Sequence, residues 1–364
     1  MRLGVEAAVV EGTYVPGDVT IADGSVADVA LTRGSGRGIA VAGFVDLQVN
    51  GFGGVDFATA DAEGYRRAGA ALLETGVTAF QPTFVTAPEA DLVAALQGIP
   101  SEPIGPRILG AHLEGPFLSP ERLGAHPASA QRDPDRALLE RLLDAGPVSQ
   151  MTLAPELAGA LELVDVLQAR GVVVSCGHSN ATAEQAAAAF ERGVRSVTHL
   201  FNAMRPFAHR DPGLAGAALA RDDVVVQVIL DGHHVADETA KVVWKAAAGR
   251  VALVTDAMAA TGVGDGRYRL GGVEVEVRDG VARRIEDGVL AGSVGTMLES
   301  IRKLNALGAA LPEAIAAATS VPARLSGRIP GVLRAGGDAD IVVLDDRLEI
   351  TAVFVGGKEL VAVG

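Results

Sequence analysis

The stretch VVVSCGHSN covers residues 172–180 and joins a β-type run to a histidine. Its apolar, β-branched part, Val172 to Cys176, predicts a buried strand. Thr182 then predicts an N-cap, and the Ala-rich residues 183–192 predict a helix. A strand followed directly by a helix is the repeating unit of parallel α/β proteins. In such a unit, His178 lies just beyond the carboxyl end of its strand.

The same unit recurs on both sides of this stretch. Apolar β-type runs alternate with Ala- and Leu-rich helical stretches, and there are eight such runs: 41–47, 79–84, 108–113, 151–154, 172–176, 196–199, 224–230 and 251–255. Eight strands separated mostly by helices predict an α/β fold in which a parallel sheet closes into a (β/α)8 barrel, the TIM barrel.

The two ends of the chain have a different pattern. Residues 1 to about 40 contain short β segments between Gly-rich turns, and residues 340–344 and 351–355 continue that pattern near the other end. We therefore expect the termini to form one small β-sandwich from residues 1–42 and 326–364, beside a barrel over residues 43–325. Residues 266–290 alternate valines with charges and predict a β-hairpin inserted near the eighth barrel strand.

Polar side chains follow the predicted barrel strands where the strands end. The carboxyl ends of barrel strands lie on one rim, and TIM-barrel enzymes build their active sites there. Seven polar residues belong to this rim: Gln48 and Asn50 after the first strand, His112 and Glu114 after the third, His178 after the fifth, His199 after the sixth and Asp256 after the eighth.

Glu114, His178 and His199 combine one carboxylate with two imidazoles. This donor set suits a divalent ion such as Zn2+, with Fe2+ as the alternative, and leaves coordination positions for water and substrate. An ion held in this way acidifies water and polarises a carbonyl oxygen, which are the two tasks of amide hydrolysis. We therefore expect a catalytic site with one divalent ion per chain.

Asp256 is expected to serve as the proton carrier of this site. It would take a proton from the attacking water and return it to the departing amine, which is otherwise a poor leaving group. Each rim residue also has a plainer interpretation. A single histidine at a strand end is commonly a hydrogen-bonded structural residue, and Asp256 could cap the next helix. Glu114 has no helix to cap, because Gly115 and Pro116 follow it at once.

Composition limits the class of protein. The formal net charge of -14 argues against nucleic acid or an anionic membrane surface as partner, because both require a basic footprint. No apolar run reaches the ~20 residues of a membrane-spanning helix, and the first ten residues do not resemble a signal peptide. Cys176 is the one cysteine and is expected to be a small buried hydrophobe. These features favour a cytoplasmic enzyme that acts on a small molecule.

Six motifs resemble those of a known family. They are DLQVNG (46–51), HLEGPF (112–117), GHS (177–179), THLFNAM (198–204), DGHH (231–234) and TDA (255–257). In this order they resemble the N-acetylglucosamine-6-phosphate deacetylases of the amidohydrolase superfamily. THLFNAM is the most specific string, and the likeness covers nearly the whole chain.

The resemblance implies a role for each residue of the site. Glu114, His178 and His199 would bind the metal, Asp256 would be the catalytic acid and base, and the protein would be a homodimer. The phosphorylated N-acetyl amino sugar would contact His126, Asn202, Ala203 and His234, while Arg210 would pair with the phosphate, in this family often from the neighbouring subunit. His209 and His233 are left out of this prediction.

The first-strand positions indicate how many metals the site holds. Many amidohydrolases carry a His-x-His pair there for a second metal, whereas this chain has Gln48 and Asn50. Neutral amides are poor ligands for such an ion, so the pair predicts vestigial second-metal positions in the one-metal branch of the superfamily.

Three alternatives remain open from sequence. The first is deacetylation of N-acetylgalactosamine 6-phosphate, an epimer that differs at one hydroxyl. The second, from another class, is a non-catalytic amidohydrolase-like binding protein, although such a protein would be expected to lack a metal ligand or Asp256. The third is a deaminase or cyclic-amide hydrolase, and Gln48 and Asn50 count against it.

Overall fold

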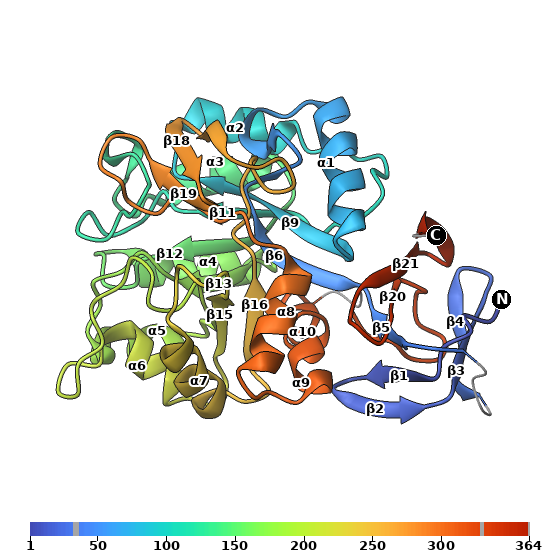
Figure 1. The fold of residues 1–364 in the computed structure, drawn as a ribbon. Coiled ribbons are helices and arrows are strands. Elements are labelled where there is room, and N and C mark those ends of the chain that lie inside the picture. Colours follow the sequence, from blue (N-terminus) through green and yellow to red (C-terminus); the bar gives the residue numbers. More distant parts are fainter. Residues whose placement is uncertain (32–35, 328–330, 363–364) are drawn as a thin grey trace.

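The computed structural model describes residues 1–31, 36–327 and 331–362, which form a barrel with a smaller β domain beside it (Figure 1). Backbone ladders join the eight barrel strands in parallel, in chain order, and the short β10 (Arg107–Ile108) also pairs with β9. The barrel strands are β6 (Phe44–Val49), β9 (Val77–Val85), β11 (Ala111–Glu114), β12 (Val148–Leu153), β13 (Val173–Cys176), β14 (Ser196–Val197), β15 (Val225–Ile229) and β16 (Val251–Val254). The predicted (β/α)8 barrel is confirmed.

Helices cover the outside of the barrel sheet (Figure 1). They are α1 (Ala62–Glu74), α2 (Glu89–Gln97), α3 (Arg136–Ala145), α4 (Ala160–Ala169), α5 (Ala183–Glu191), α6 (Gly213–Leu219), α7 (Asp237–Ala246), α8 (Met297–Ala306), α9 (Leu311–Ala316) and α10 (Ser320–Leu325), with 3-10 turns η1 (Phe57–Thr59) and η2 (Ala128–Ala130). Thr182 caps α5 as predicted, since its hydroxyl accepts the backbone N–H of Gln185. In the described part of the chain, none of the helices has the length and hydropathy that crossing a bilayer requires.

The first predicted strand is divided in the structure. β5 (Ile39–Ala42) pairs with strands of the small domain, whereas β6 begins the barrel. Gly43 lies between them, and a Cβ at this position would come within 1.9 Å of Thr78 Oγ1. Glycine therefore allows the close approach at which the chain passes from one sheet to the other. The apolar run 41–47 does not reveal this change, because β5 and β6 are both fully buried.

Both ends of the chain build the small β domain. A six-stranded mixed sheet has the order β2-β1-β5-β20-β21-β22, and a β3–β4 hairpin packs against it. The strands are β1 (Ala7–Val10), β2 (Thr13–Pro16), β3 (Asp18–Ala22), β4 (Ser25–Leu31), β20 (Ile341–Leu344), β21 (Ile350–Val355) and β22 (Lys358–Ala362). Val19 and Val26 of the hairpin share a buried cluster with Ala40 and Ile341 of the sheet. The prediction that the termini form a separate β domain is confirmed.

A three-stranded sheet is inserted between β16 and α8, where the sequence predicted only a hairpin. Its strands are β17 (Gly266–Leu270), β18 (Val273–Arg278) and β19 (Val281–Arg284), and a short β7 (Gly51–Phe52) and β8 (Val55–Asp56) pair lies after β6. Leu270 and Val275 pack with Met258 and Ala260, which follow the eighth barrel strand. The insertion therefore lies against the segment that leaves the barrel rim.

The first and last barrel strands, β6 and β16, meet in a different way from the other neighbouring strands. Among the described residues, β6 and β16 share no ladder, and one bridge joins Val49 to Ala257 just beyond β16. The carboxylate of Asp46 replaces the missing ladder, because Oδ1 accepts the backbone N–H of Thr255 at 3.2 Å and Oδ2 accepts the Thr255 hydroxyl at 2.6 Å. We call this junction of residues 46–50 with residues 254–257 the seam.

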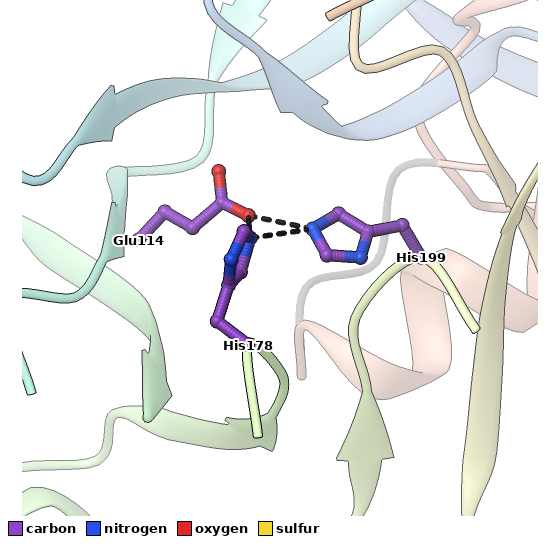
Figure 2. Close-up of side chains that lie close together, drawn as sticks. All are labelled: Glu114, His178 and His199. Carbon is purple, nitrogen blue, oxygen red and sulfur yellow. Dashed lines mark hydrogen bonds and ion pairs between the residues drawn. The ribbon is translucent and has the colours of Figure 1, made fainter. Parts of the chain in front are cut away.

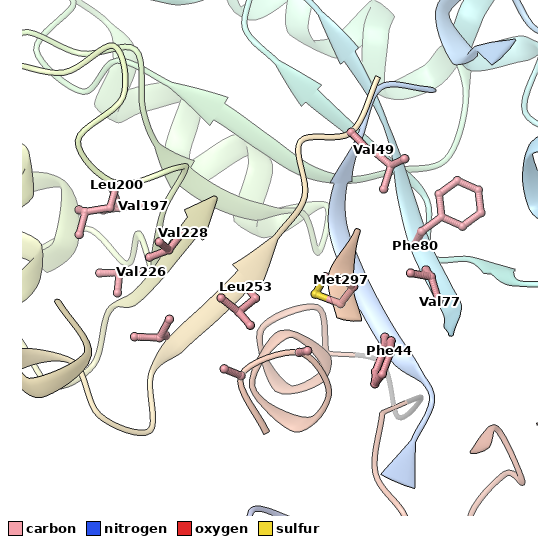
Figure 3. Close-up of a cluster of buried hydrophobic side chains, with 14 of the residues drawn as sticks. Phe44, Val49, Val77, Phe80, Val197, Leu200, Val226, Val228, Leu253 and Met297 are labelled. Atoms are coloured by element: carbon pink, nitrogen blue, oxygen red, sulfur yellow. The ribbon is translucent and has the colours of Figure 1, made fainter. Parts of the chain in front are cut away.

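A continuous apolar cluster supports the barrel wall (Figure 3). Phe44 and Phe80 come from the first two barrel strands, Val226 and Leu253 from the last two, and Met297 from α8. All five side chains are fully buried. Close packing of this kind holds the strands, and hence the residues at their carboxyl ends, in fixed relative positions.

Candidate metal centre and catalytic site

Glu114, His178 and His199 meet at the rim of the barrel (Figure 2). Glu114 ends β11, His178 follows β13 and His199 follows β14. Glu114 Oε1 lies 2.9 Å from His178 Nε2 and 2.7 Å from His199 Nε2, and the two Nε2 atoms are 3.0 Å apart. All three residues are buried. We call them the metal group, because their ligand atoms converge on one point.

The contacts around the metal group fit a cation at its centre. His178 Nδ1 lies 3.0 Å from the carbonyl oxygen of Arg122, and since a carbonyl only accepts, Nδ1 carries a proton and Nε2 is the ring nitrogen that can bind an ion. Burial alone would raise the pKa of Glu114, but the imidazoles of His126, His178 and His199 hold that pKa well below its usual value. Lone pairs this close repel one another unless a cation lies among them, so the donors suit a divalent ion.

The metal group and Asp256 together comprise four residues, and three of them have a left-handed backbone. The φ angle is 47° at His178, 30° at His199 and 52° at Asp256. This conformation costs a residue that has a Cβ about 1–3 kcal/mol, and it persists only where the surrounding structure enforces it. Each of these residues lies two positions after the last residue of a barrel strand, so the rigid barrel enforces the turn.

Asp256 lies at the seam, and two side-chain amides bind its carboxylate. Asp256 Oδ1 accepts hydrogen bonds from Gln48 Nε2 at 3.1 Å and from Asn50 Nδ2 at 2.7 Å. Burial, together with the negative charge of Glu114, raises the pKa of Asp256 to about 8. A carboxyl group with such a pKa exchanges its proton near neutral pH, which is the property that a proton carrier needs.

Gln48 and Asn50 direct their amide nitrogens at carboxylates. Besides Asp256, Gln48 Nε2 also donates to Glu114 Oε2 at 3.2 Å. The lowered pKa of Glu114 keeps it ionised, and an ionised carboxylate only accepts, which fixes the nitrogen end of Gln48 toward it. Gln48 Oε1 and Asn50 Oδ1 are buried and have no hydrogen-bond partner in the described part of the chain. An unpaired buried acceptor of this kind costs about 1–3 kcal/mol.

The metal group and Asp256 line one cavity of about 360 Å³. Four of the five predicted substrate contacts line the same cavity, namely His126, Asn202, Ala203 and His234. His126 is buried rather than on a loop surface: its Nδ1 accepts the backbone N–H of Thr86 at 3.1 Å, and its Nε2 lies 3.7 Å from Glu114 Oε2.

His234 is held in place by Asp231. His234 Nδ1 lies 2.8 Å from Asp231 Oδ2, and Asp231 Oδ1 accepts the backbone N–H groups of His233 and His234. Burial would raise the pKa of Asp231, but the hydrogen bonds, chiefly from the His234 side chain, lower it below its usual value. Asp231 therefore stays ionised and accepts a hydrogen bond from His234 Nδ1–H, which leaves Nε2 as the ring nitrogen available to a ligand in the cavity. His233 is exposed.

The structure does not bring Arg210 to the cavity of its own chain. Arg210 and His209 are exposed in the segment between β14 and α6, and Arg210 is not among the residues that line the cavity. Within the described ranges, Arg210 has no ion-pair partner. Its guanidinium is thus available to a neighbouring molecule.

Two buried polar residues near the rim do not join the metal group. His112 Nε2 is 2.7 Å from Thr152 Oγ1, and burial lowers the pKa of His112 to about 4, so this ring is neutral. Cys176 is fully buried in β13, where burial raises the pKa of its thiol. His112 and Cys176 therefore belong to the interior of the barrel.

Sequence reasoning missed two kinds of residue in this site. Asp46 and Asp231 lie inside the motifs DLQVNG and DGHH, so a search for buried acceptors among the motif residues could have found them. The apolar side of the cavity, formed by Leu270, Val273, Val289 and Leu290, comes from the inserted sheet and the loop after it. No local pattern signals that these residues reach the rim.

A parallel (β/α)8 barrel whose strand ends carry a buried metal group beside an acidic residue defines the class of metal-dependent barrel hydrolases. The family model described as the Amidohydrolase family matches residues 39–360. N-acetylglucosamine-6-phosphate deacetylase of Rattus norvegicus is 40% identical over 345 residues, covering 90% of this chain and 84% of the relative. N-acetylgalactosamine-6-phosphate deacetylase of Escherichia coli O157:H7 is 35% identical over 365 residues, covering 96% of each chain.

A solved structure shows the same similarity to N-acetylglucosamine-6-phosphate deacetylases. A mutant of N-acetyl-D-glucosamine-6-phosphate deacetylase from Mycobacterium smegmatis, in complex with N-acetyl-D-glucosamine-6-phosphate, has a TM-score of 0.94 and 38% identity to this chain, covering 100% of this chain and 99% of that one. The chain belongs to the amidohydrolase family, among its N-acetylglucosamine-6-phosphate deacetylases. The resemblance inferred from the motifs is confirmed.

Proposed function

We propose that this chain hydrolyses the N-acetyl amide of N-acetylglucosamine 6-phosphate, giving glucosamine 6-phosphate and acetate. The observation that carries the proposal is the meeting of the metal group and Asp256 in one cavity, in a chain of this family. A non-catalytic binding protein would have no use for either feature. A deaminase or cyclic-amide hydrolase would be expected to have histidines where Gln48 and Asn50 stand.

The metal group holds one divalent ion per chain, Zn2+ in the first instance and Fe2+ as the alternative. The donors are two imidazole nitrogens and one carboxylate oxygen, which suit either ion. Gln48 and Asn50 present no ligand atom to a second ion between Glu114 and Asp256, because the amide nitrogens, which have no lone pair to share, are the atoms that face these carboxylates. When bound, the ion polarises the acetyl carbonyl and lowers the pKa of water.

Asp256 moves the proton of the reaction. As a carboxylate it accepts a proton from the water whose oxygen attacks the acetyl carbon. As an acid it then donates that proton to the amide nitrogen while the C–N bond breaks, so the free amine and acetic acid form, and the acid releases the second water proton to leave as acetate. His126, Asn202, Ala203 and His234 line the same cavity and orient the sugar.

Arg210 binds the substrate phosphate of a partner chain in a homodimer. Its exposure and its lack of an ion-pair partner in the described residues support this role. The chain carries a formal net charge of -14, so a phosphate needs a local cation, and a guanidinium offers a bidentate fork.

The galacto epimer is the second candidate substrate, because the Escherichia coli relative named for N-acetylgalactosamine-6-phosphate is also 35% identical. An acetate-release assay should compare N-acetylglucosamine 6-phosphate, its galacto epimer and unphosphorylated N-acetylglucosamine, with metal content measured on the same sample. We expect the highest kcat/KM for the gluco phosphate and about one metal per chain. A metal-loaded sample inert toward all three compounds would contradict the proposal, and a preference for the epimer would reassign the substrate.

A further inference from the structure

The side-chain amides at the seam bind only carboxylates through their nitrogens. Gln48 is fully buried on β6, and its Nε2 donates both to Asp256 Oδ1 and to Glu114 Oε2. Asn50 follows the same strand and donates to Asp256 Oδ1 at 2.7 Å. The two positions that could have held a second cation thus supply neutral donors to the acid that moves the proton.

The two oxygens of Asp256 therefore differ. Oδ1 receives two hydrogen bonds, whereas Oδ2 receives none from the residues that the structure describes. We propose that Gln48 and Asn50 are positioning residues, which fix the Asp256 carboxylate with Oδ1 occupied so that Oδ2 carries the proton. This inference rests on the proposed function. It gives a role to Gln48 and Asn50, which stand at positions that would not bind a second metal.

The seam explains why such positioning is needed. The ligand-bearing strands β11, β13 and β14 are each paired by backbone ladders on both sides, whereas β6 and β16 are not paired to each other by a ladder. On the side that faces β6, Asp256 is therefore held by contacts across the seam, while the β15–β16 ladder and the backbone N–H of Ser293 hold it on the other side. Gln48 also links Asp256 to Glu114, so the proton carrier is tied to a metal ligand.

Gln81 shows what distinguishes Gln48 from an ordinary buried glutamine. Gln81 on β9 is also fully buried, and its Oε1 also has no partner among the described residues. Its Nε2, however, donates to the hydroxyl of Ser149 at 2.9 Å. An unpaired amide oxygen is thus common to both glutamines, and only Gln48 binds the reactive carboxylates. Gln81 provides a matched control for substitution.

The test replaces the amides with apolar side chains of similar size in the metal-loaded enzyme. We expect Gln48→Met and Asn50→Leu each to lower kcat about 10- to 100-fold, with KM changed less than about twofold and about one metal per chain retained. Gln81→Met should keep wild-type kcat, while its melting temperature changes at least as much as that of Gln48→Met. Wild-type kcat in both seam variants would overturn the inference, as would a loss of metal at unchanged kcat per bound metal.

A double-mutant cycle separates positioning from a general structural defect. If Gln48 acts through Asp256, adding Gln48→Met to Asp256→Asn should lower kcat less than about twofold further. A full additional loss would contradict the inference, because two independent defects multiply. If wild type itself released no acetate, the proposed function would fail instead, so the two failures are distinguishable.

Discussion

Glu114 and Asp256 are two buried carboxylates on one rim, and their surroundings shift their pKa values in opposite directions. Imidazoles face Glu114 and hold its pKa well below the usual value, although burial opposes them. Asp256 faces neutral amides and the charge of Glu114, and burial raises its pKa to about 8. Glu114 thus remains an anion that can hold a cation, while Asp256 can exchange a proton. Two carboxylates on one rim acquire different tasks from their neighbours alone.

The difference extends to the strands that carry them. Glu114 ends a strand paired by backbone on both sides, so its position follows from the barrel itself. Asp256 follows a strand at the seam, where no backbone ladder joins β6 to β16 and the side chains of Asp46, Gln48 and Asn50 add hydrogen bonds to the bridge at Ala257. Substitutions at the seam are therefore expected to leave metal binding by the metal group intact. The same substitutions should impair proton transfer by Asp256.

The largest effect should come from removing a metal ligand. We expect His199→Ala to reduce bound metal from about one ion per chain to near zero and to abolish acetate release, because two donors bind a divalent ion too weakly. Metal analysis after dialysis checks this prediction. His233→Ala, an exposed neighbour of the cavity, is the control and should keep both metal and activity. Full metal content in the His199 variant would place the ion elsewhere.

A smaller but selective effect should follow from changing the proton carrier. We expect Asp256→Asn to fold and keep its metal, yet to lose about 10²- to 10⁴-fold in kcat, the contribution typical of general acid–base catalysis. Near-normal turnover in this variant would exclude Asp256 as the proton carrier.

The pH profile tests the same residue in the wild type. The carboxylate is the active base of the free enzyme, so kcat/KM should fall as pH falls through the pKa of Asp256 and level off above it. Burial raises that pKa to about 8, and a nearby bound cation lowers it, so the inflection should lie at or somewhat below about 8. An unchanged inflection in the residual activity of Asp256→Asn would assign it to another group.

The smallest effect is expected at Arg210, which belongs neither to the metal group nor to the seam. Arg210→Ala should raise KM for the phosphorylated substrate about 10- to 100-fold, the value of a charge-assisted bidentate contact, and should change little for the unphosphorylated sugar. Arg170→Ala, which removes an exposed arginine paired with Asp144, is the control. Equal effects of Arg210→Ala on both substrates would refute a phosphate contact.

Much of the fold and the residues of the metal group were predictable from sequence. Eight apolar runs with helices between them indicate a parallel barrel, and a barrel brings Glu114, His178 and His199 to one rim whatever the loops do. Their presence on the same rim therefore follows from topology, while the left-handed turns at His178 and His199 complete their approach. The N-cap at Thr182 was predictable for a similar reason, since it depends on its near neighbours in the chain.

The remainder depends on contacts between distant segments. The role of Asp46 follows from the missing ladder at the seam, which no single strand pattern reveals. The division of the first strand at Gly43 is hidden because both halves are fully buried, so neither shows the alternation of a half-exposed strand. The apolar side of the cavity comes from residues 270–290, whose local pattern indicates strands but not what those strands cover.

The most direct test of the central claim is anomalous diffraction from crystals of the metal-loaded protein, measured at the absorption edge of the bound ion. We predict one anomalous peak per chain, within coordination distance of Glu114, His178 and His199, with Gln48 and Asn50 still directed at Asp256. A peak located elsewhere, or a second peak of equal height beside Gln48 and Asn50, would contradict the account.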